Sequence, residues 1–269
     1  MKVKINGVKY NVESAGQGET LLLLHGFTGS LENWKPFLKV WASSYHVVML
    51  DILGHGKSDN PQDVLRYSIK QIADDLKELL EMLNINKAHV LGYSMGGRLA
   101  LTLAVKYPQY ISSLILESSS PGLEREEERN ERIKKDEALA NFILKEGIEA
   151  FVDYWENIPL FFTQKSLSKD IREKIRHQRL NNNKIGLANS LCGMGSGKQP
   201  SWWNYLNRLN MPVYIMVGEQ DKKFYQIANK MIKKLPNAKT TVVKGTGHAI
   251  HVEQPDLFGK MIIDFLKST

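Results

Sequence analysis

The sequence predicts an α/β protein, with a mostly parallel sheet, helices on both of its faces and an inserted helical cap. Two observations lead to this fold class. Short apolar runs alternate with segments of helical periodicity along most of the 269 residues, as in buried parallel strands joined by helices. Between residues 122 and 210 this alternation stops, and the chain becomes highly charged with helical patterning. No Gly/Pro-rich linker flanks that stretch, so we expect one core of residues 1–121 and 211–269, with 122–210 inserted as a cap rather than an independent domain.

The elements of the core follow from apolar runs and turn residues. Residues 2–13 should form a hairpin, because Asn6-Gly7 suits a type I′ turn. A helix should begin at Ser68, where Gln71 stands at the spacing of a capping box. The other expected elements are strands at 21–24, 47–50, 88–91, 114–116, 213–217 and 241–243, and helices over 99–105, between the last two strands and at the C-terminus.

The clearest chemical motif is Gly92-Tyr93-Ser94-Met95-Gly96, which fits G-x-S-x-G. It follows a predicted strand and opens a predicted helix, and this context distinguishes a nucleophile elbow from a chance Gly/Ser turn. A sharp strand-to-helix turn would expose the Ser94 hydroxyl, and the helix N-terminus behind it would favour negative charge on its oxygen.

A serine hydroxyl needs a base before it reacts. In this type of fold the chain order is serine, then an acid, then histidine. Asp221 and His248 each follow a predicted strand, and open α/β sheets gather their sites at such carboxyl ends. His248 would take the proton and Asp221 would orient the imidazole. Glu219 and His251 are the nearest rivals, and a surface loop is the alternative for both positions.

The segment His25-Gly26-Phe27 also follows a predicted strand. At this place the backbone N–H groups of Phe27 and Met95 would form an oxyanion hole. His55, in a further loop after a strand, could be catalytic, but we favour a structural turn there.

Composition excludes several classes of function. The formal net charge is +7, yet no block of five or six basic residues occurs, which argues against a nucleic-acid partner and leaves a small anionic substrate or a solubilising surface.

Cys192 is the single cysteine and is expected to be a passive small residue. The histidines show no metal-binding spacing, so neither metal nor cofactor is expected. No apolar run reaches 18 residues and the start lacks a signal-peptide pattern, so we expect a cytoplasmic protein without membrane insertion.

Five stretches together resemble the α/β-hydrolase superfamily, and they span the whole predicted core. They are residues 24–27, 51–58, 92–97, 218–221 and 245–248. Further features resemble one family within it, the 2-succinyl-6-hydroxy-2,4-cyclohexadiene-1-carboxylate synthases of menaquinone biosynthesis. These features are Arg98 after the elbow, Ser120 to Leu123 followed by Glu128, Arg129, Arg132 and Asp136, then Arg179 with Asn181 to Asn183, and the segment 190–201. Cys192 departs from the family pattern, which usually has an arginine there.

The resemblance implies an unusual reaction for this fold. Members are lyases that eliminate pyruvate from a cyclohexene with three carboxylates, and the triad serine acts as a base. By position, the anion-binding arginines of the family fall on Arg98, Arg132 and Arg179. Its further binding residues fall on Tyr93 and Trp155.

Physical reasoning on the three arginines leaves alternatives open. Arg98 lies about one helical turn after Ser94 and could face the same pocket. Arg132 stands among alternating charges, which also suit a solvated helix with i,i+4 ion pairs. Arg179, before three asparagines, could equally be a surface residue.

Three functions are therefore compared. The first is the pyruvate-eliminating lyase, with the three arginines converging beside Ser94. The second is a serine hydrolase that uses the same residues through an acyl-enzyme. The third is a binding protein on a disused hydrolase fold, which the intact set of Ser94, Asp221 and His248 disfavours.

Overall fold

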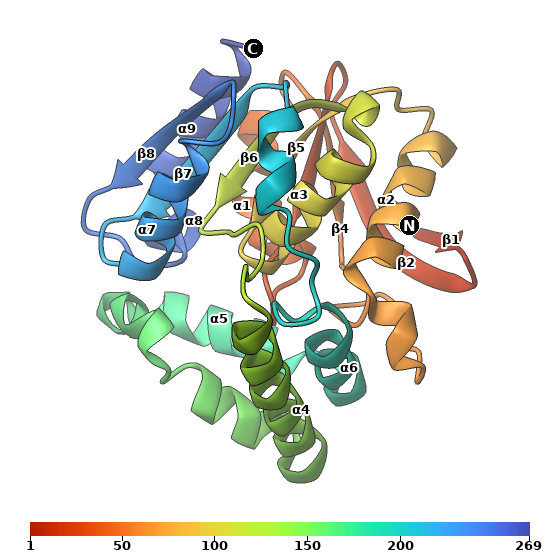
Figure 1. Ribbon diagram of the computed structural model, residues 1–269, viewed down its shortest axis with the longest axis vertical. Helices are drawn as coiled ribbons and strands as arrows, with labels where there is room; N and C mark the ends of the chain where they lie inside the picture. Colours follow the sequence, from red (N-terminus) through yellow and green to blue (C-terminus); the bar gives the residue numbers. More distant parts are fainter.

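The computed structural model describes residues 1–269 as an eight-stranded sheet between two layers of helices (Figure 1). The strand order is β1-β2-β4-β3-β5-β6-β7-β8. Both pairings of β2 are antiparallel and all the others are parallel. The α/β-hydrolase fold class predicted from the sequence is confirmed. The strands are β1 (Lys2–Ile5), β2 (Val8–Ala15), β3 (Thr20–Leu24), β4 (His46–Leu50), β5 (Ala88–Tyr93), β6 (Ile111–Glu117), β7 (Val213–Gly218) and β8 (Ala238–Val243).

Nine α-helices complete the fold, with short 3-10 segments between them. The helices are α1 (Lys35–Trp41), α2 (Ile69–Met82), α3 (Met95–Lys106), α4 (Glu126–Trp155), α5 (Lys169–Leu180), α6 (Lys184–Met194), α7 (Lys222–Met231), α8 (Ile250–Glu253) and α9 (Pro255–Leu266). Two of the 3-10 segments matter below, η4 (Pro159–Ser166) and η5 (Trp203–Arg208).

Two local predictions have different outcomes. The hairpin is confirmed, because Ile5 pairs with Val8 and the turn residues Asn6 and Gly7 both have positive φ, as a type I′ turn requires. The capping box at Ser68 is wrong. Its side chain caps no helix N–H, and its own N–H donates to Leu65 O at 3.2 Å, so Ser68 closes the preceding 3-10 turn.

Apolar side chains fill both faces of the sheet. On one face, α2, α3 and α7 cover the larger cluster, which includes Leu76, Leu99 and Met231. On the other face, α1 and α9 cover a second cluster around Trp41 and Phe258. Every residue of β3 is buried, as expected of a parallel strand between two helical layers.

The chain between β6 and β7 contains no strand. In Figure 1 its helices α4, α5 and α6 lie together beneath the main body. They have a small apolar cluster of their own, in which Ile143 and Phe151 of α4 pack with Leu187 and Leu191 of α6. Helix α4 bends at Gly147, where φ is +87°. We call the segment from Gly122 to Pro200 the cap.

Where the cap meets the core, hydrogen bonds join the chain at the start of the cap to the chain just after its end. Trp202 N–H donates to Pro121 O at 2.8 Å, and the indole N–H of Trp203 donates to Gly122 O at 2.9 Å. The indole N–H of Trp202 also donates to Thr102 Oγ1 of α3 at 2.9 Å. Both tryptophans belong to the larger core cluster, so the chain rejoins the core before residue 210.

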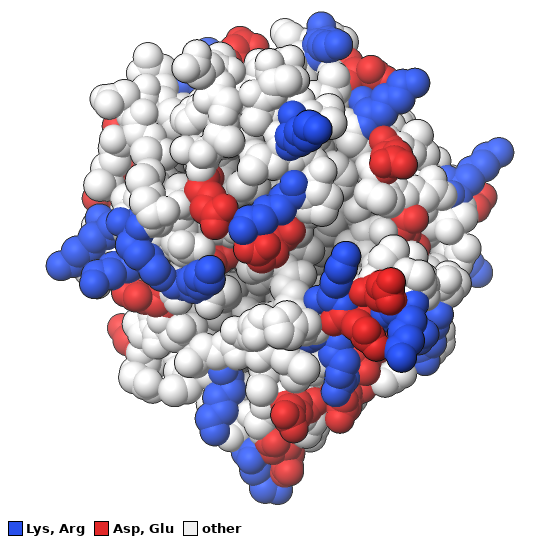
Figure 2. Space-filling model, turned by 180° about the vertical axis from the view of Figure 1, so that it is seen from behind, with Lys and Arg blue, Asp and Glu red and all other residues white.

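The surface carries charges of both signs. On the face shown in Figure 2, basic and acidic side chains are interspersed rather than gathered into one basic stripe. No helix in the structure combines the length and apolar character needed to cross a membrane.

Candidate active site

Ser94 occupies the turn between β5 and α3, at φ +50° and ψ −107°. This strained conformation is sparsely populated for a residue with a side chain and is typical of a functional turn. Two glycines make it possible. A Cβ on Gly96 would collide with Leu24 O, and one on Gly92 would collide with Gly96 O. The turn is further fixed by the Ser94 N–H, which donates to Glu117 O at 2.9 Å.

The structure brings His248 and Asp221 together at Ser94. His248 Nε2 lies 3.0 Å from Ser94 Oγ, and Nδ1 lies 2.6 Å from Asp221 Oδ2. A carboxylate only accepts hydrogen bonds, so Nδ1 carries the proton and Nε2 is left to accept the hydroxyl proton. Both side chains are buried, which strengthens their electrostatic coupling. The arrangement is that of a serine–histidine–aspartate triad.

The two rivals are engaged elsewhere. His251 donates through Nδ1 to the buried carboxylate of Glu117 at 2.9 Å. Glu219 accepts from Gly245 N–H at 3.0 Å. Neither contacts Ser94 through a hydrogen bond.

The N–H groups of Phe27 and Met95 are unpaired in the protein. Both residues line the cavity that contains Ser94. The loop that carries Phe27 runs directly beside the serine, since a Cβ on Gly26 would lie 3.6 Å from Ser94 Cβ. Two free backbone donors beside the Ser94 hydroxyl have the chemistry of an oxyanion hole.

Two buried histidines shape that loop and do not line the cavity. His25 donates through Nδ1 to Gly26 O at 2.8 Å and accepts from Ile52 N–H through Nε2 at 2.9 Å. Burial lowers the pKa of His25 to about 4 and that of His55 to about 3, so both are neutral at pH 7. His55 packs against the rings of His25 and Phe27, which agrees with the structural turn favoured for it.

Ser94 opens into a cavity of about 350 Å³ between the core and the cap. Core and cap residues both line it, and they include Arg98, Arg132, Trp155, Phe161, Trp203 and Lys223. The cavity therefore combines aromatic walls with several cations, and Glu124 and Glu128 line it as well.

Arg98 lines this cavity and has no carboxylate partner. Its Nη1 donates to Met194 O at 2.7 Å and to Gln199 Oε1 at 2.9 Å. Burial, and then the nearby charge of Arg132, lowers the pKa of Arg98 to about 10. It remains a cation at pH 7, held by two neutral acceptors.

Arg132 lines the same cavity from α4. Its Nε donates to Asp136 Oδ1 at 2.8 Å, and its side chain is 39% exposed. The i,i+4 ion pair considered from the sequence is therefore present, yet the guanidinium faces the cavity as well. Burial raises the pKa of Asp136 even though Arg132 opposes that shift.

Tyr93 and Trp155 both line the cavity. The Tyr93 ring lies 5.4 Å from the His248 ring, measured between centroids. The indole N–H of Trp155 is buried without a hydrogen-bond partner.

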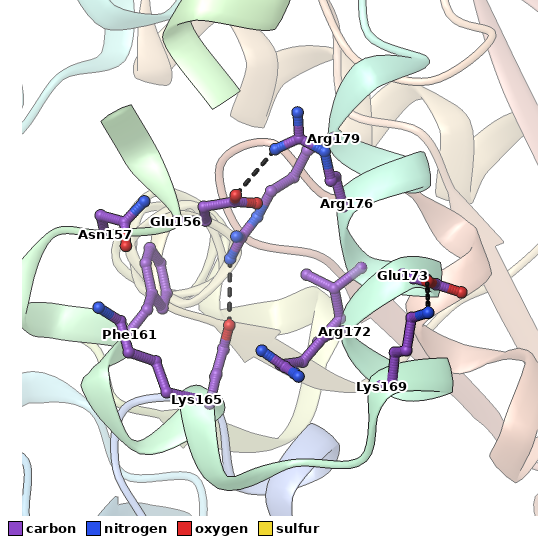
Figure 3. Close-up of a pocket in the computed structure, with 11 residues that line it drawn as sticks. Glu156, Asn157, Phe161, Lys165, Lys169, Arg172, Glu173, Arg176 and Arg179 are labelled. Carbon is purple, nitrogen blue, oxygen red and sulfur yellow. Dashed lines mark hydrogen bonds and ion pairs between the residues drawn. The ribbon is translucent and has the colours of Figure 1, made fainter. Parts of the chain in front are cut away.

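Arg179 does not join Arg98 and Arg132, contrary to the expectation that all three arginines would converge. Figure 3 shows it in a neighbouring cavity of about 320 Å³ between η4 and α5. It donates to Gln164 Oε1 at 3.2 Å and stacks on the Phe161 ring. Phe161 lines both cavities, whereas Arg179 does not line the cavity that contains Ser94. A sequence pattern could not predict this placement of Arg179.

Sequence reasoning missed two residues at the site. Lys223 lines the cavity, two positions after Asp221, and burial lowers its pKa. Lys223 could have been predicted from its position at the start of α7, close to Asp221. Gln199 contacts Arg98 from the far end of the cap, 101 residues along the chain, and no local pattern indicates such a pair. No group of three or more His, Cys, Asp or Glu side chains is placed to hold a metal ion.

Residues 19–255 match the family described as the alpha/beta hydrolase fold. A Bacillus subtilis (strain 168) protein, provisionally named 2-succinyl-6-hydroxy-2,4-cyclohexadiene-1-carboxylate synthase, is 48% identical over 98% of this chain and 96% of its own. The solved structure of MenH from S. aureus superposes with a TM-score of 0.92 at 38% identity, covering 96% of this chain and 98% of that one. A thermophilic esterase from Thermogutta terrifontis, with malate bound, has a TM-score of 0.87 at 26% identity, over 100% and 98% of the two chains.

Proposed function

Because the chain belongs to the α/β-hydrolase family, and within it to the 2-succinyl-6-hydroxy-2,4-cyclohexadiene-1-carboxylate synthases, we propose that it is the lyase that forms this compound. It would eliminate pyruvate from a cyclohexene that carries three carboxylates and an enolpyruvyl ether. The product is an intermediate of menaquinone biosynthesis. The cytoplasmic location expected from the sequence stays a prediction.

One observation carries the proposal beyond the family, namely the Arg98 cation in the Ser94 cavity, which has no carboxylate partner in the protein. Arg98 has only neutral acceptors, and Arg132 and Lys223 add further cations to the same cavity. A desolvated arginine–carboxylate hydrogen bond contributes about 1.5–3 kcal/mol. A neutral ester would leave the Arg98 guanidinium without an anionic partner, whereas a polycarboxylate would supply one.

In the proposed mechanism Ser94 acts as a base. His248 Nε2 accepts the Ser94 hydroxyl proton while Ser94 Oγ removes an acidic proton from the carbon next to the conjugated carbonyl. Asp221 stabilises the imidazolium that results. The developing dienolate oxygen would be held by the free N–H groups of Phe27 and Met95.

The elimination then completes without a covalent intermediate. The dienolate electrons form the second ring double bond and break the C–O bond to the enolpyruvyl group. The departing enolate takes the proton from His248 and becomes pyruvate, and Ser94 keeps the proton that it removed from the substrate as its own hydroxyl proton. Trp155 would form part of the aromatic wall against the bound substrate, and Tyr93 would pack beside His248.

The second candidate is a serine hydrolase, and the complete triad with two free backbone donors favours it. The same atoms could attack an ester carbonyl and stabilise the tetrahedral oxyanion. Arg179 favours neither candidate, because it does not line the cavity that contains Ser94.

The test is to supply the enolpyruvyl-bearing tricarboxylate and to follow pyruvate through lactate dehydrogenase and NADH oxidation. Rapid pyruvate release that depends on Ser94 supports the lyase. If the protein releases no pyruvate but turns over p-nitrophenyl esters with a burst, the lyase assignment is wrong and the hydrolase stands.

A further inference from the structure

The guanidinium group of Arg98 is held from one side only. Both of its hydrogen bonds leave from Nη1, one to Met194 O at 2.7 Å and one to Gln199 Oε1 at 2.9 Å. Arg98 belongs to α3 of the core, whereas both acceptors lie in the last part of the cap. These two contacts therefore join the core wall of the cavity to the cap wall.

The two bonds use both N–H groups of Nη1 and leave the opposite edge of the guanidinium free. Nε and Nη2 of Arg98 have no partner in the protein, and neither is among the buried polar atoms without partners. Because Arg98 lines the Ser94 cavity, we place this free edge at open space there. The Nε–Nη2 edge is one that binds a carboxylate through two parallel hydrogen bonds.

A role in stabilising the fold does not explain why Gln199 is buried. Its side chain is 1% exposed, and its Nε2 is buried without any acceptor. An unpaired buried donor is unfavourable for folding. Its amide oxygen, in contrast, has one partner, which is Arg98.

The neutrality of Gln199 matters as much as its position. Asp136, the carboxylate that interacts with Arg98 over a distance, is already hydrogen-bonded to Arg132. With Met194 O and an amide oxygen as its only acceptors, Arg98 keeps its full charge for a ligand. A glutamate at position 199 would have nearly the same shape but would neutralise Arg98 internally.

We propose that Gln199 is a positioning residue that sets substrate specificity by fixing Arg98 in both orientation and charge. It holds Nη1, so that the Nε–Nη2 edge receives one carboxylate of the anionic substrate in bidentate fashion beside Ser94. The inference rests on the proposed function, because it requires a substrate with carboxylates. It assigns one of these carboxylates to the Nε–Nη2 edge of Arg98.

The decisive variant is Gln199→Glu, with Gln109→Glu as its matched control. Gln109 is exposed in a 3-10 turn away from the cavity, so its variant makes the same chemical change without touching Arg98. In the pyruvate-release assay, Gln199→Glu should raise KM at least tenfold and change kcat less than threefold. Gln109→Glu should match the wild type. A merely structural role would instead lower the folded fraction and kcat while leaving KM unchanged.

Binding without turnover supplies a second readout. In a Ser94→Ala background, calorimetry should show at least tenfold weaker substrate binding after Gln199→Glu, and a smaller loss of about threefold after Gln199→Met, which removes the acceptor but adds no charge. Gln199→Met also serves if the glutamate variant does not fold. Unchanged KM and Kd in a folded variant would overturn the inference. If the wild type releases no pyruvate, the proposed function fails separately, and binding of benzene-1,2,4-tricarboxylate to wild type and Gln199→Glu still decides the role of Gln199.

Discussion

The core and the cap contribute to the site in different ways. The core supplies Ser94, Asp221 and His248 from the ends of three strands, and hydrogen bonds of 2.6–3.0 Å connect them. The cap supplies Arg132 and Trp155 from one bent helix, with Phe161 after it. Core groups are fixed by the sheet, whereas cap groups depend on how three helices pack. We infer that the core determines which chemical step is possible, and that the cap together with Arg98 of the core determines which molecule undergoes it.

The largest expected effect comes from removing the Ser94 hydroxyl, which the core supplies. Ser94→Ala should lower kcat by about 10⁴-fold or more, as removal of a triad serine does in other enzymes. Substrate affinity in calorimetry should remain, because the cations of the cavity are untouched. Ser43→Ala, at an exposed position after α1, is the control. Loss of binding together with turnover would contradict the division between core and cap.

The next largest effect is expected from removing the arginines at the boundary between core and cap. Arg98→Ala should cost about 2–5 kcal/mol in kcat/KM, the range for truncating one partner of a buried charge pair. Arg132→Ala should cost less, because Arg132 is 39% exposed and already paired with Asp136. Steady-state kinetics of pyruvate release give both values. Equal or reversed costs would mean that the substrate lies nearer to the cap than we propose.

The core should also be the more pH-sensitive region, through His25. Its folded pKa of about 4 lies below the ordinary value of 6.5, so the unfolded chain binds more protons between these values. Stability is therefore full above pH 6.5 and falls as the pH decreases to about 4. Urea unfolding at pH 7 and pH 4.5 should show a loss of about 2.5 kcal/mol from this residue, at about 1.4 kcal/mol for each pH unit between 6.5 and 4.5.

His25→Asn should reduce that pH dependence, even though its stability at pH 7 is lower. His177→Asn, on the exposed side of α5, should leave the dependence as it is in the wild type. A wild-type slope in His25→Asn would show that His25 is not the group that titrates.

The smallest effect concerns the cap alone. Asn183 caps α6, because its Oδ1 accepts from Ile185 N–H at 2.9 Å and from Gly186 N–H at 3.2 Å. Asn183→Ala should cost about 1 kcal/mol in thermal or urea unfolding. Asn183→Asp should retain most of that stability. If Asn183→Ala changed kcat as strongly as it changed KM, the cap would influence the chemical step directly.

The same division explains what could be predicted from the sequence. Ser94, Asp221 and His248 were found because a parallel sheet gathers strand ends, and strands leave a clear apolar signal. Local signals were less reliable where neighbouring turns compete, as at Ser68, whose backbone completes an earlier turn. Helix packing over long sequence separations places Arg179 in the neighbouring cavity. It also brings Gln199 into contact with Arg98. No periodicity or spacing encodes those contacts.

The hydrogen bonds between Pro121 and Trp202 and between Gly122 and Trp203 have a consequence for how such proteins diversify. They bring the two ends of a segment of almost eighty residues side by side on the finished core. A segment whose ends are neighbours can be lengthened, shortened or exchanged by recombination without a break in the sheet. Because these hydrogen bonds hold the two ends of the cap together, the cap can be replaced without changing the sheet. An ancestral protein with this triad could therefore acquire a new substrate through a single insertion.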